Sequence, residues 1–302
     1  MIKHKSILGF IVLCIIWSST WLFIKLGLET MPPFFSVGIR FFIAFLILFL
    51  YSLKLKLKFP KELKSHIFLF YFGFILFTAA YGLVYWGEQY INSGLTSVLF
   101  SVMPFYTVVF SIKMLPEEHI TFKKIVGIVL GFVGILIIFG DQIDLGLEHP
   151  LAAYGMIAVL LSPLFSALGS IMGKKVSNKY QPVTLNTLPL LYASISFLII
   201  SYFTESQEHL HLTGMAWFSL FYLGIVGTAI AFVVYFWMLR HTSMLLMSSI
   251  TFITPPMALI WGWVVLGEQI TLKLVLGMII VFTGLWFVRD LKSKTVKGSI
   301  EI

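Results

Sequence analysis

Long apolar stretches separated by short polar loops dominate the hydrophobic pattern of this chain. A helix needs about 20 apolar residues to cross the hydrocarbon core of a bilayer. Ten stretches approach that length: 7–27, 34–53, 66–86, 94–114, 122–140, 152–172, 187–204, 215–238, 246–266 and 272–289. The pattern therefore predicts an all-α membrane protein with ten transmembrane helices and little chain left for a soluble domain.

The same residues recur in the two halves of the chain. Residues 69–73 read Leu-Phe-Tyr-Phe-Gly and residues 220–224 read Leu-Phe-Tyr-Leu-Gly, at an offset of 151. That offset also aligns Trp86 with Trp237, Ser97 with Ser248 and Pro104 with Pro255. Each copy holds five helices, an odd number, so the second copy enters the membrane from the opposite side. The pattern predicts two inverted five-helix repeats, at 1–143 and 144–291, followed by a cytoplasmic tail at 292–302.

Composition and charge narrow the class of protein. Hydrophobic residues make up 59% of the chain and charged residues 11%, and the mean hydropathy is +0.98, which excludes a water-soluble globular protein. The net charge of +8 does not indicate a nucleic-acid partner, because Lys and Arg recur in every second loop and in both tails. The positive-inside rule then predicts a multi-pass membrane protein with both termini in the cytoplasm.

Several motifs resemble those of the EamA family of the drug/metabolite transporter superfamily. The residues that carry the resemblance are Trp17, Pro32-Pro33, Arg40, Pro104, Pro255 and a Glu-x-Ile-Thr followed by spaced glycines in both halves. The resemblance covers nearly the whole chain and implies ten helices in two inverted repeats. For function and location it implies an exporter of amino acids, metabolites or drugs in the cell (inner) membrane. The second repeat departs from the pattern, because Ser166 stands where Trp17 would align and Arg40 has no clear counterpart.

Aromatic and hydroxyl side chains at helical spacing predict a substrate cavity between the repeats. Tyr and Trp combine a flat apolar face with a hydrogen-bonding group, which suits an amphipathic metabolite. The open alternative is that these aromatic residues face lipid or form interfacial belts. The predicted cavity residues are Trp17, Trp21, Thr78, Tyr81, Tyr85, Ser97, Ser101, Ser166, Ser170, Phe232, Ser248 and Thr251.

Two prolines and three charged residues add hypotheses about movement. Pro104 and Pro255 fall near the middle of the fourth and ninth spans, where a missing N–H weakens the helix, and we expect a hinge or, alternatively, a static kink. Arg40 lies inside the second span and needs a partner or a route to water. We expect a pair with Glu88, near Lys25, as an outer gate or a fold-orienting contact; snorkelling to the interface is the alternative.

Two further features of the repeats predict architecture. An offset of 150 aligns Glu118 with Glu268, and because each precedes Ile-Thr just before a helix, both are expected to cap helix N-termini. Small-residue faces in the fifth and tenth helices permit close helix approach. The glycines concerned are Gly127, Gly131, Gly134, Gly277 and Gly284.

The functional prediction is a secondary transporter, by resemblance an exporter, of small amphipathic metabolites such as amino acids or related compounds, or of drugs, by alternating access. The sequence shows no phosphate-binding glycine loop, no paired metal ligands and no nucleophile beside a base, so no enzyme activity and no cofactor or metal is predicted. The alternatives are a membrane-embedded enzyme acting on lipid head groups and a non-transporting receptor. Expected partners are a small-molecule substrate and the lipid bilayer, for a monomer or homodimer.

Overall fold

The computed structural model describes residues 2–91, 93–139, 149–206, 210–266 and 272–288, and every regular element within these ranges is helical. Glu268, the junction expected at 143/144 and the tail expected at 292–302 lie outside the described residues. The elements of the first half are α1 (Ile2–Leu28), α2 (Pro33–Lys54), α3 (Leu63–Gly73), η1 (Phe74–Ala79), α4 (Ala80–Gly87), α5 (Ser93–Phe100), α6 (Met103–Met114) and α7 (Phe122–Phe139). Those of the second half are α8 (Ala152–Val176), α9 (Pro182–Thr204), α10 (Gly214–Phe221), η3 (Tyr222–Ile230), α11 (Ala231–Leu239), α12 (Met244–Ser248), α13 (Ile250–Leu266) and α14 (Leu272–Val288).

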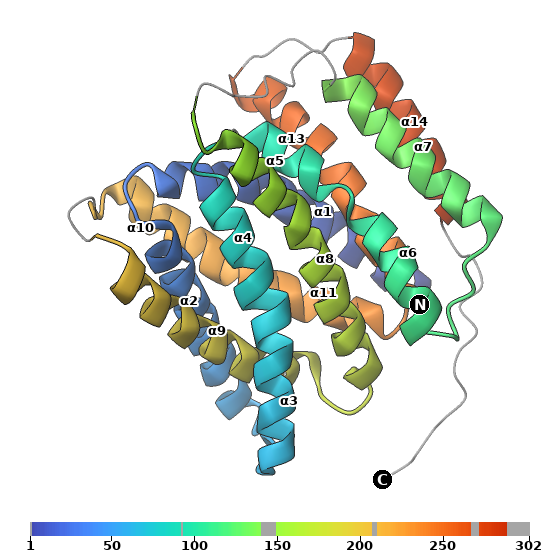
Figure 1. Cartoon of the computed structure of the whole chain (residues 1–302). Helices are drawn as coiled ribbons and strands as arrows, with labels where there is room; N and C mark the ends of the chain where they lie inside the picture. The colour runs from blue at the N-terminus through green and yellow to red at the C-terminus, as the bar shows by residue number, and fades with distance from the viewer. Residues whose placement is uncertain (1, 92, 140–148, 207–209, 267–271, 289–302) are drawn as a thin grey trace.

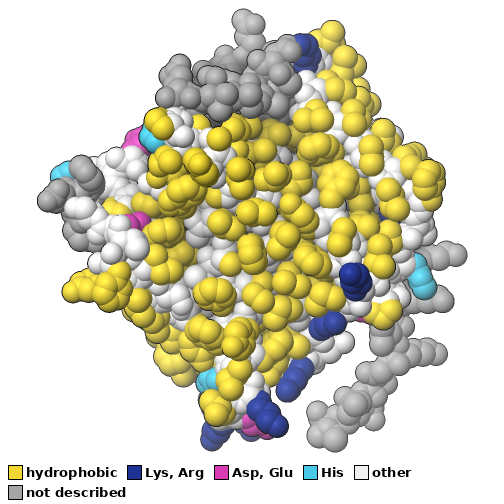
Figure 2. All heavy atoms as spheres, viewed as in Figure 1, with side chains coloured by type: hydrophobic (Ala, Val, Ile, Leu, Met, Phe, Trp, Pro, Cys, Tyr) yellow, Lys and Arg dark blue, Asp and Glu magenta, His cyan; other side chains and the backbone are white. Residues whose placement is uncertain are grey.

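The helices are those of a multi-pass membrane protein. Each of the ten predicted stretches is largely helical within the described residues. Seven continuous helices there are long and apolar enough to cross a membrane, and shorter apolar helices cover Met244–Ala258 and Val275–Val288. Hydrophobic side chains cover most of the face seen in Figure 2, while Lys and Arg gather along its lower edge. An apolar exterior of this kind is stable in lipid rather than in water.

The equivalent helices α7 and α14 pack side by side and run in opposite directions (Figure 1). A Cβ atom built on Gly127, near the start of α7, would lie 2.6 Å from the carbonyl oxygen of Gly284, near the end of α14. One built on Gly134 would lie 2.8 Å from the carbonyl oxygen of Gly277. The expectation that these glycines allow close helix approach is therefore confirmed, and the contact lies within the chain.

The α2–α9 pair shows the same antiparallel arrangement. The carboxylate of Glu205, just after α9, accepts hydrogen bonds from the backbone N–H groups of Phe34 and Phe35 at 2.6 and 2.9 Å. These N–H groups belong to the first turn of α2, where backbone N–H groups have no acceptor within the helix. A carboxylate is therefore favourable at that position. Proline in the first turn starts both helices, at Pro33 and Pro182, because the missing N–H costs nothing there.

Two interruptions of the α-helical hydrogen-bond pattern occur in each repeat. The third and eighth spans contain π-helical segments, η1 and η3, and the offset of 151 places η1 entirely within the counterpart η3. The fourth span is broken at residues 101–102, between α5 and α6, and the ninth at Ser249, between α12 and α13. The breaks therefore precede the prolines, since Pro104 lies in the first turn of α6 and Pro255 lies inside α13.

Candidate functional site

A cavity of about 90 Å³ lies in the interior of the bundle, and both repeats contribute to its wall. Helices α1, α2 and α4 supply wall residues from the first repeat, and α8, α11 and α13 supply them from the second. The wall is predominantly apolar, with a few polar groups. Such a composition is typical of small-molecule sites.

Aromatic rings form one side of the cavity. The Trp17 ring packs against Phe232 and Tyr235 from α11, with ring centroids 5.6 and 5.4 Å apart. Its indole Nε1–H donates to the carbonyl oxygen of Gly227 in η3 at 3.3 Å. Trp21, one helical turn along α1, packs edge-on against Phe100 at 5.3 Å. Contacts with the second repeat thus hold Trp17 in place, whereas the Trp21 contact lies within the first repeat.

Arg40 is the one charged side chain in the described cavity wall, and only 1% of it is exposed. Its Nε–H donates to the Thr228 hydroxyl at 2.8 Å, and Nη1 donates to the Tyr85 hydroxyl at 3.1 Å. Nη2 lies 3.5 Å from the carbonyl oxygen of Gly227, and the guanidinium lies 5.0 Å from the centre of the Tyr81 ring. All of these partners are neutral.

The π-helical segments help to position these groups. In a π-helix the backbone hydrogen bonds are displaced from the α-helical pattern, and such segments occur frequently at functional sites. In η3, Gly227 presents its carbonyl oxygen to both Trp17 and Arg40. A Cβ atom at this glycine would lie 3.0 Å from the Thr20 side chain, so a larger residue would press on α1. In η1, Leu76 contributes to the cavity wall.

Comparison with known proteins identifies the family. The model of the EamA-like transporter family matches the chain twice, at residues 4–140 and 153–289. The chain therefore belongs to the EamA-like transporter family. This confirms the resemblance seen in the sequence and the two-repeat architecture, and it makes the protein a membrane transporter by family.

Relatives of this EamA protein cover nearly its full length. It is 31% identical over 286 residues to the uncharacterized transporter YoaV of Bacillus subtilis (strain 168), covering 93% of this chain and 96% of that one. It is 25% identical over 284 residues to protein PagO of Salmonella typhimurium, covering 91% and 92%. A solved crystal structure matches with a TM-score of 0.80 at 15% sequence identity, covering 94% of this chain and 96% of that one, and thus shares the fold.

The cavity of the EamA protein contains some of the predicted residues and not others. Those in its wall are Trp17, Trp21, Tyr81, Ser166, Ser170, Phe232 and Thr251. Those that do not line it are Thr78, Tyr85, Ser97, Ser101 and Ser248. The wall of this cavity thus contains seven of the twelve predicted residues.

Local hydrogen bonds explain most of these exclusions. A serine in a helix can donate to a backbone carbonyl three or four residues earlier. Ser97 donates to Gly94 at 2.7 Å and Ser248 to Leu245 at 2.9 Å. Ser101 donates to the carbonyl oxygen of Thr251 at 2.9 Å, which joins the break in the fourth span to α13. Tyr85 is buried beside the cavity, where its hydroxyl accepts from Arg40.

The expected Arg40–Glu88 pair is not a direct contact. No ion pair within 4.0 Å joins these two described residues, and the Glu88 carboxylate oxygens are buried without a hydrogen-bond partner in the described part of the chain. Lys25 approaches Glu88 through the backbone, because its Nζ donates to the carbonyl oxygens of Glu88 at 2.9 Å and Ile91 at 3.2 Å. Three charges therefore share one end of the bundle without forming a closed network.

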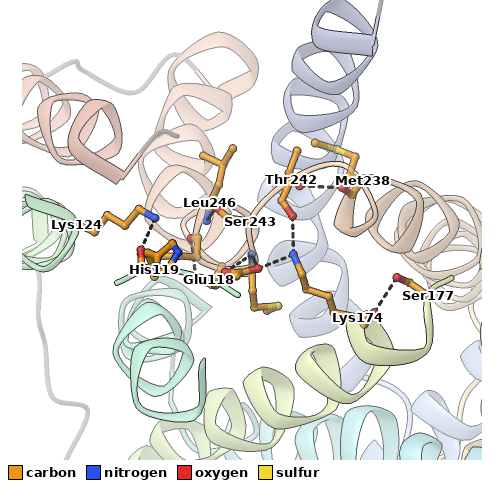
Figure 3. Close-up of polar contacts among 12 residues, drawn as sticks. Glu118, His119, Lys124, Lys174, Ser177, Met238, Thr242, Ser243 and Leu246 are labelled. Carbon is orange, nitrogen blue, oxygen red and sulfur yellow. Dashed lines mark hydrogen bonds and ion pairs between the residues drawn. The ribbon is translucent and has the colours of Figure 1, made fainter. Parts of the chain in front are cut away.

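A second polar cluster lies at the opposite end, where α8 ends and α12 begins (Figure 3). Glu118 forms an ion pair with Lys174, and its carboxylate oxygens accept from the backbone N–H of Met244 at 2.7 and 2.9 Å. Lys174 also donates to the carbonyl oxygen of Thr242 at 2.7 Å. Glu118 therefore caps α12 of the second repeat, rather than the helix that follows it in sequence.

Sequence reasoning missed several wall residues that a helical projection could have found. Thr20 and Ile24 continue the α1 stripe that begins at Trp17, at spacings of three and four residues. Thr254 extends the α13 stripe from Thr251 in the same way. Tyr235 had no such signal, because apolar residues surround α11 on every side in the sequence.

Proposed function

We propose that this EamA protein is a secondary transporter that moves small amphipathic solutes by alternating access through the cavity described above. The observation that carries the proposal is the cavity itself, an aromatic and hydroxyl-lined space whose wall is shared by the two repeats. A site between repeats can face either side of the membrane when one repeat rocks against the other. The antiparallel pairs α2–α9 and α7–α14 support an inverted arrangement of the repeats.

The size of the cavity favours a small metabolite over a drug. Pockets for drug-sized ligands usually measure about 300–1,000 Å³. The cavity measures about 90 Å³, so it would need to open considerably before it could admit a large ligand. Amino acids and related compounds have the required combination of small size, apolar body and polar end.

The proposal includes ten crossings, both termini in the cytoplasm and outward transport. The gathering of Lys and Arg along one edge of the molecule supports this orientation (Figure 2). The test uses cysteine labelling in intact cells, since the single native cysteine, Cys14, is buried. We expect Glu29→Cys to react with a membrane-impermeant maleimide from outside, and Lys58→Cys to react only after permeabilisation. The reverse pattern contradicts the orientation.

Transport itself is tested with the purified full-length protein in liposomes loaded with a mixed pool of labelled metabolites. We expect the wild type to release a subset of the pool faster than empty liposomes do. Ser166→Phe should abolish this release, because the added ring occupies the cavity opposite Trp17. Leu161→Phe lies on the same helix, 42% exposed on the exterior, and should behave like wild type.

Two outcomes count against the proposal. A folded wild-type protein that moves no solute favours the receptor or the lipid head-group enzyme. Equal release by the wild type and by Ser166→Phe shows that solutes do not use this cavity.

A further inference from the structure

The bonding of Arg40 within the cavity wall is incomplete. A guanidinium carries five N–H donors and cannot lose its charge. The contacts with Thr228, Tyr85 and Gly227 use one donor on each nitrogen, and the longest of these contacts is 3.5 Å. Within the described residues, two N–H groups therefore have no hydrogen-bond acceptor at 3.5 Å or less, and the Tyr81 side chain is a further neighbour of the guanidinium. The bundle holds the Arg40 side chain in a fixed place.

The charge of Arg40 is also unbalanced. Every contact described for the guanidinium is to a neutral hydroxyl, carbonyl or aromatic ring, and no described carboxylate lies within 4.0 Å. A buried charge without a partner is strongly disfavoured, and a partner of opposite charge recovers much of that cost. Glu88 acts on Arg40 only from a distance, and Lys25 acts on the same carboxyl as a competing cation. An anion entering the cavity would supply the missing contact.

The remainder of the wall sets the other requirements on such an anion. Trp17, Trp21 and Phe232 offer aromatic faces, which suit an apolar body. Ser166, on α8, adds a hydroxyl to the wall that can bond a small polar group. Arg40 is the single cation in the described wall, so a single negative charge on the ligand balances it.

We propose that Arg40 is the anion-recognition residue of the cavity and that the transported solutes are small carboxylates with an apolar body. This inference rests on the proposed transport function. A guanidinium binds carboxylate and phosphate through the same two-pronged geometry. The single charge of the site favours the carboxylate, which carries one negative charge, over a phosphate monoester, which carries nearly two.

The test measures binding by thermal shift of the purified full-length protein, because a ligand that binds only the folded state raises its melting temperature. The probes share one phenyl body and differ in the charged group: phenylalanine, 3-phenylpropionate, phenylalaninamide, phenethylamine and phenyl phosphate. We expect the two carboxylates to bind, and the amide and the amine to bind about tenfold more weakly or worse, as loss of a charge-assisted hydrogen bond requires. Equal binding of the amide or the amine overturns the proposal, and tighter binding of phenyl phosphate overturns the choice of carboxylate.

Variants assign the preference to Arg40. Arg40→Gln should bind all five probes equally weakly, and Arg40→Lys should recover part of the carboxylate preference because it restores the charge without the planar geometry. Arg240→Gln removes an arginine that contacts the backbone of Tyr180, outside the described cavity wall, and should keep the wild-type preference. If Arg40→Gln fails to fold, the probe series on the wild-type protein still decides the proposal.

The failure of this inference differs from the failure of the proposed function. Transport of the metabolite pool without any preference for carboxylates leaves the transporter in place and removes the role of Arg40. Binding of carboxylates without transport of any solute leaves the anion site in place and removes the transporter.

Discussion

The two ends of the bundle carry related lysines in different surroundings. The offset of 149 that aligns Trp17 with Ser166 also aligns Lys25 with Lys174. Each lysine donates to a carbonyl oxygen just before the next repeat-equivalent helix, Ile91 at 3.2 Å and Thr242 at 2.7 Å, and these carbonyls are 151 residues apart. The lysine-to-carbonyl contact is thus a duplicated part of the architecture.

The acids at these ends differ. Lys174 forms an ion pair with Glu118, and the same carboxylate caps α12. Lys25 bonds only the backbone of Glu88 among the atoms of that residue, and the Glu88 carboxylate has no hydrogen-bond partner in the described chain. One end thus contains a complete ion pair, while the other contains a buried carboxyl group that can be protonated or ionised. The lysine-to-carbonyl contact is thus common to both repeats, whereas the acids beside the two lysines make the two ends different.

The largest effect on stability is expected when the Glu118–Lys174 ion pair is removed. Glu118→Ala removes the ion-pair partner of Lys174 and leaves the N–H of Met244 at the start of α12 without its acceptor. Removing one member of a largely buried pair costs about 3 kcal/mol or more. We expect a melting temperature several degrees below that of the wild type in detergent, measured by tryptophan fluorescence. The adjacent, exposed Glu117→Ala is the matched control and should melt like wild type.

An unchanged melting temperature in Glu118→Ala would show that the ion pair does not stabilise the contact between the repeats. The two ends would then be energetically alike, and the comparison would rest on geometry alone.

A smaller effect is expected at the other end. Lys25→Met removes a charged donor from the carbonyl oxygens of Glu88 and Ile91 but leaves no ion-pair partner behind. Hydrogen bonds from charged groups contribute about 1.5–3 kcal/mol, and water at this end can replace part of that contribution. We expect Lys25→Met to lower the melting temperature by less than the equivalent Lys174→Met, which isolates Glu118. A larger loss in Lys25→Met than in Lys174→Met reverses the ranking of the two ends.

The positions of the helices could be predicted from the sequence, because burial in lipid demands long apolar stretches with satisfied backbones. The aromatic part of the cavity could be predicted from the helical spacing of aromatic residues, since Trp17 and Tyr81 each lie on a helix face that points into the cavity. The π-helical segments could not be predicted, because a change of backbone register leaves no compositional trace. The sites of the helix breaks were predicted at the prolines, but Pro104 starts a helix, where its missing N–H has no partner to lose.

Long-range partners were the other gap. The helix that Glu118 caps begins 126 residues later in the sequence. The residues around Glu118, in contrast, resemble an ordinary N-terminal cap of the helix that follows directly. Two of the three hydrogen-bond partners of Arg40, Thr228 and Gly227, similarly lie in the opposite repeat. The sequence indicates that a buried polar side chain needs a partner. Which partner it has depends on how the two repeats pack against each other.

The smallest effect is expected for Glu88→Gln at acidic pH. Glu88 directly follows the membrane-spanning helix Leu63–Gly87, and burial raises the pKa of its carboxyl to about 8, partly offset by Lys25 and Arg40. Below pH 4.5 the wild-type side chain is mostly neutral in both the folded and the unfolded protein, like glutamine, and we expect the free energies of unfolding of the two proteins to differ by less than about 1 kcal/mol.

The difference between the wild type and Glu88→Gln should grow with pH. The unfolded chain releases the proton of Glu88 near the ordinary glutamate pKa of 4.5, whereas the folded protein keeps it up to about pH 8. A folded state that holds its proton more tightly contributes stability that is full below pH 4.5 and is lost as the pH rises toward 8. The melting temperature of the wild type should thus fall over this range by more than that of Glu88→Gln, in which residue 88 does not titrate. Parallel curves for the two proteins would mean that the Glu88 carboxyl is already ionised in the folded state, and hence that Lys25 and Arg40 satisfy it as fully as Lys174 satisfies Glu118.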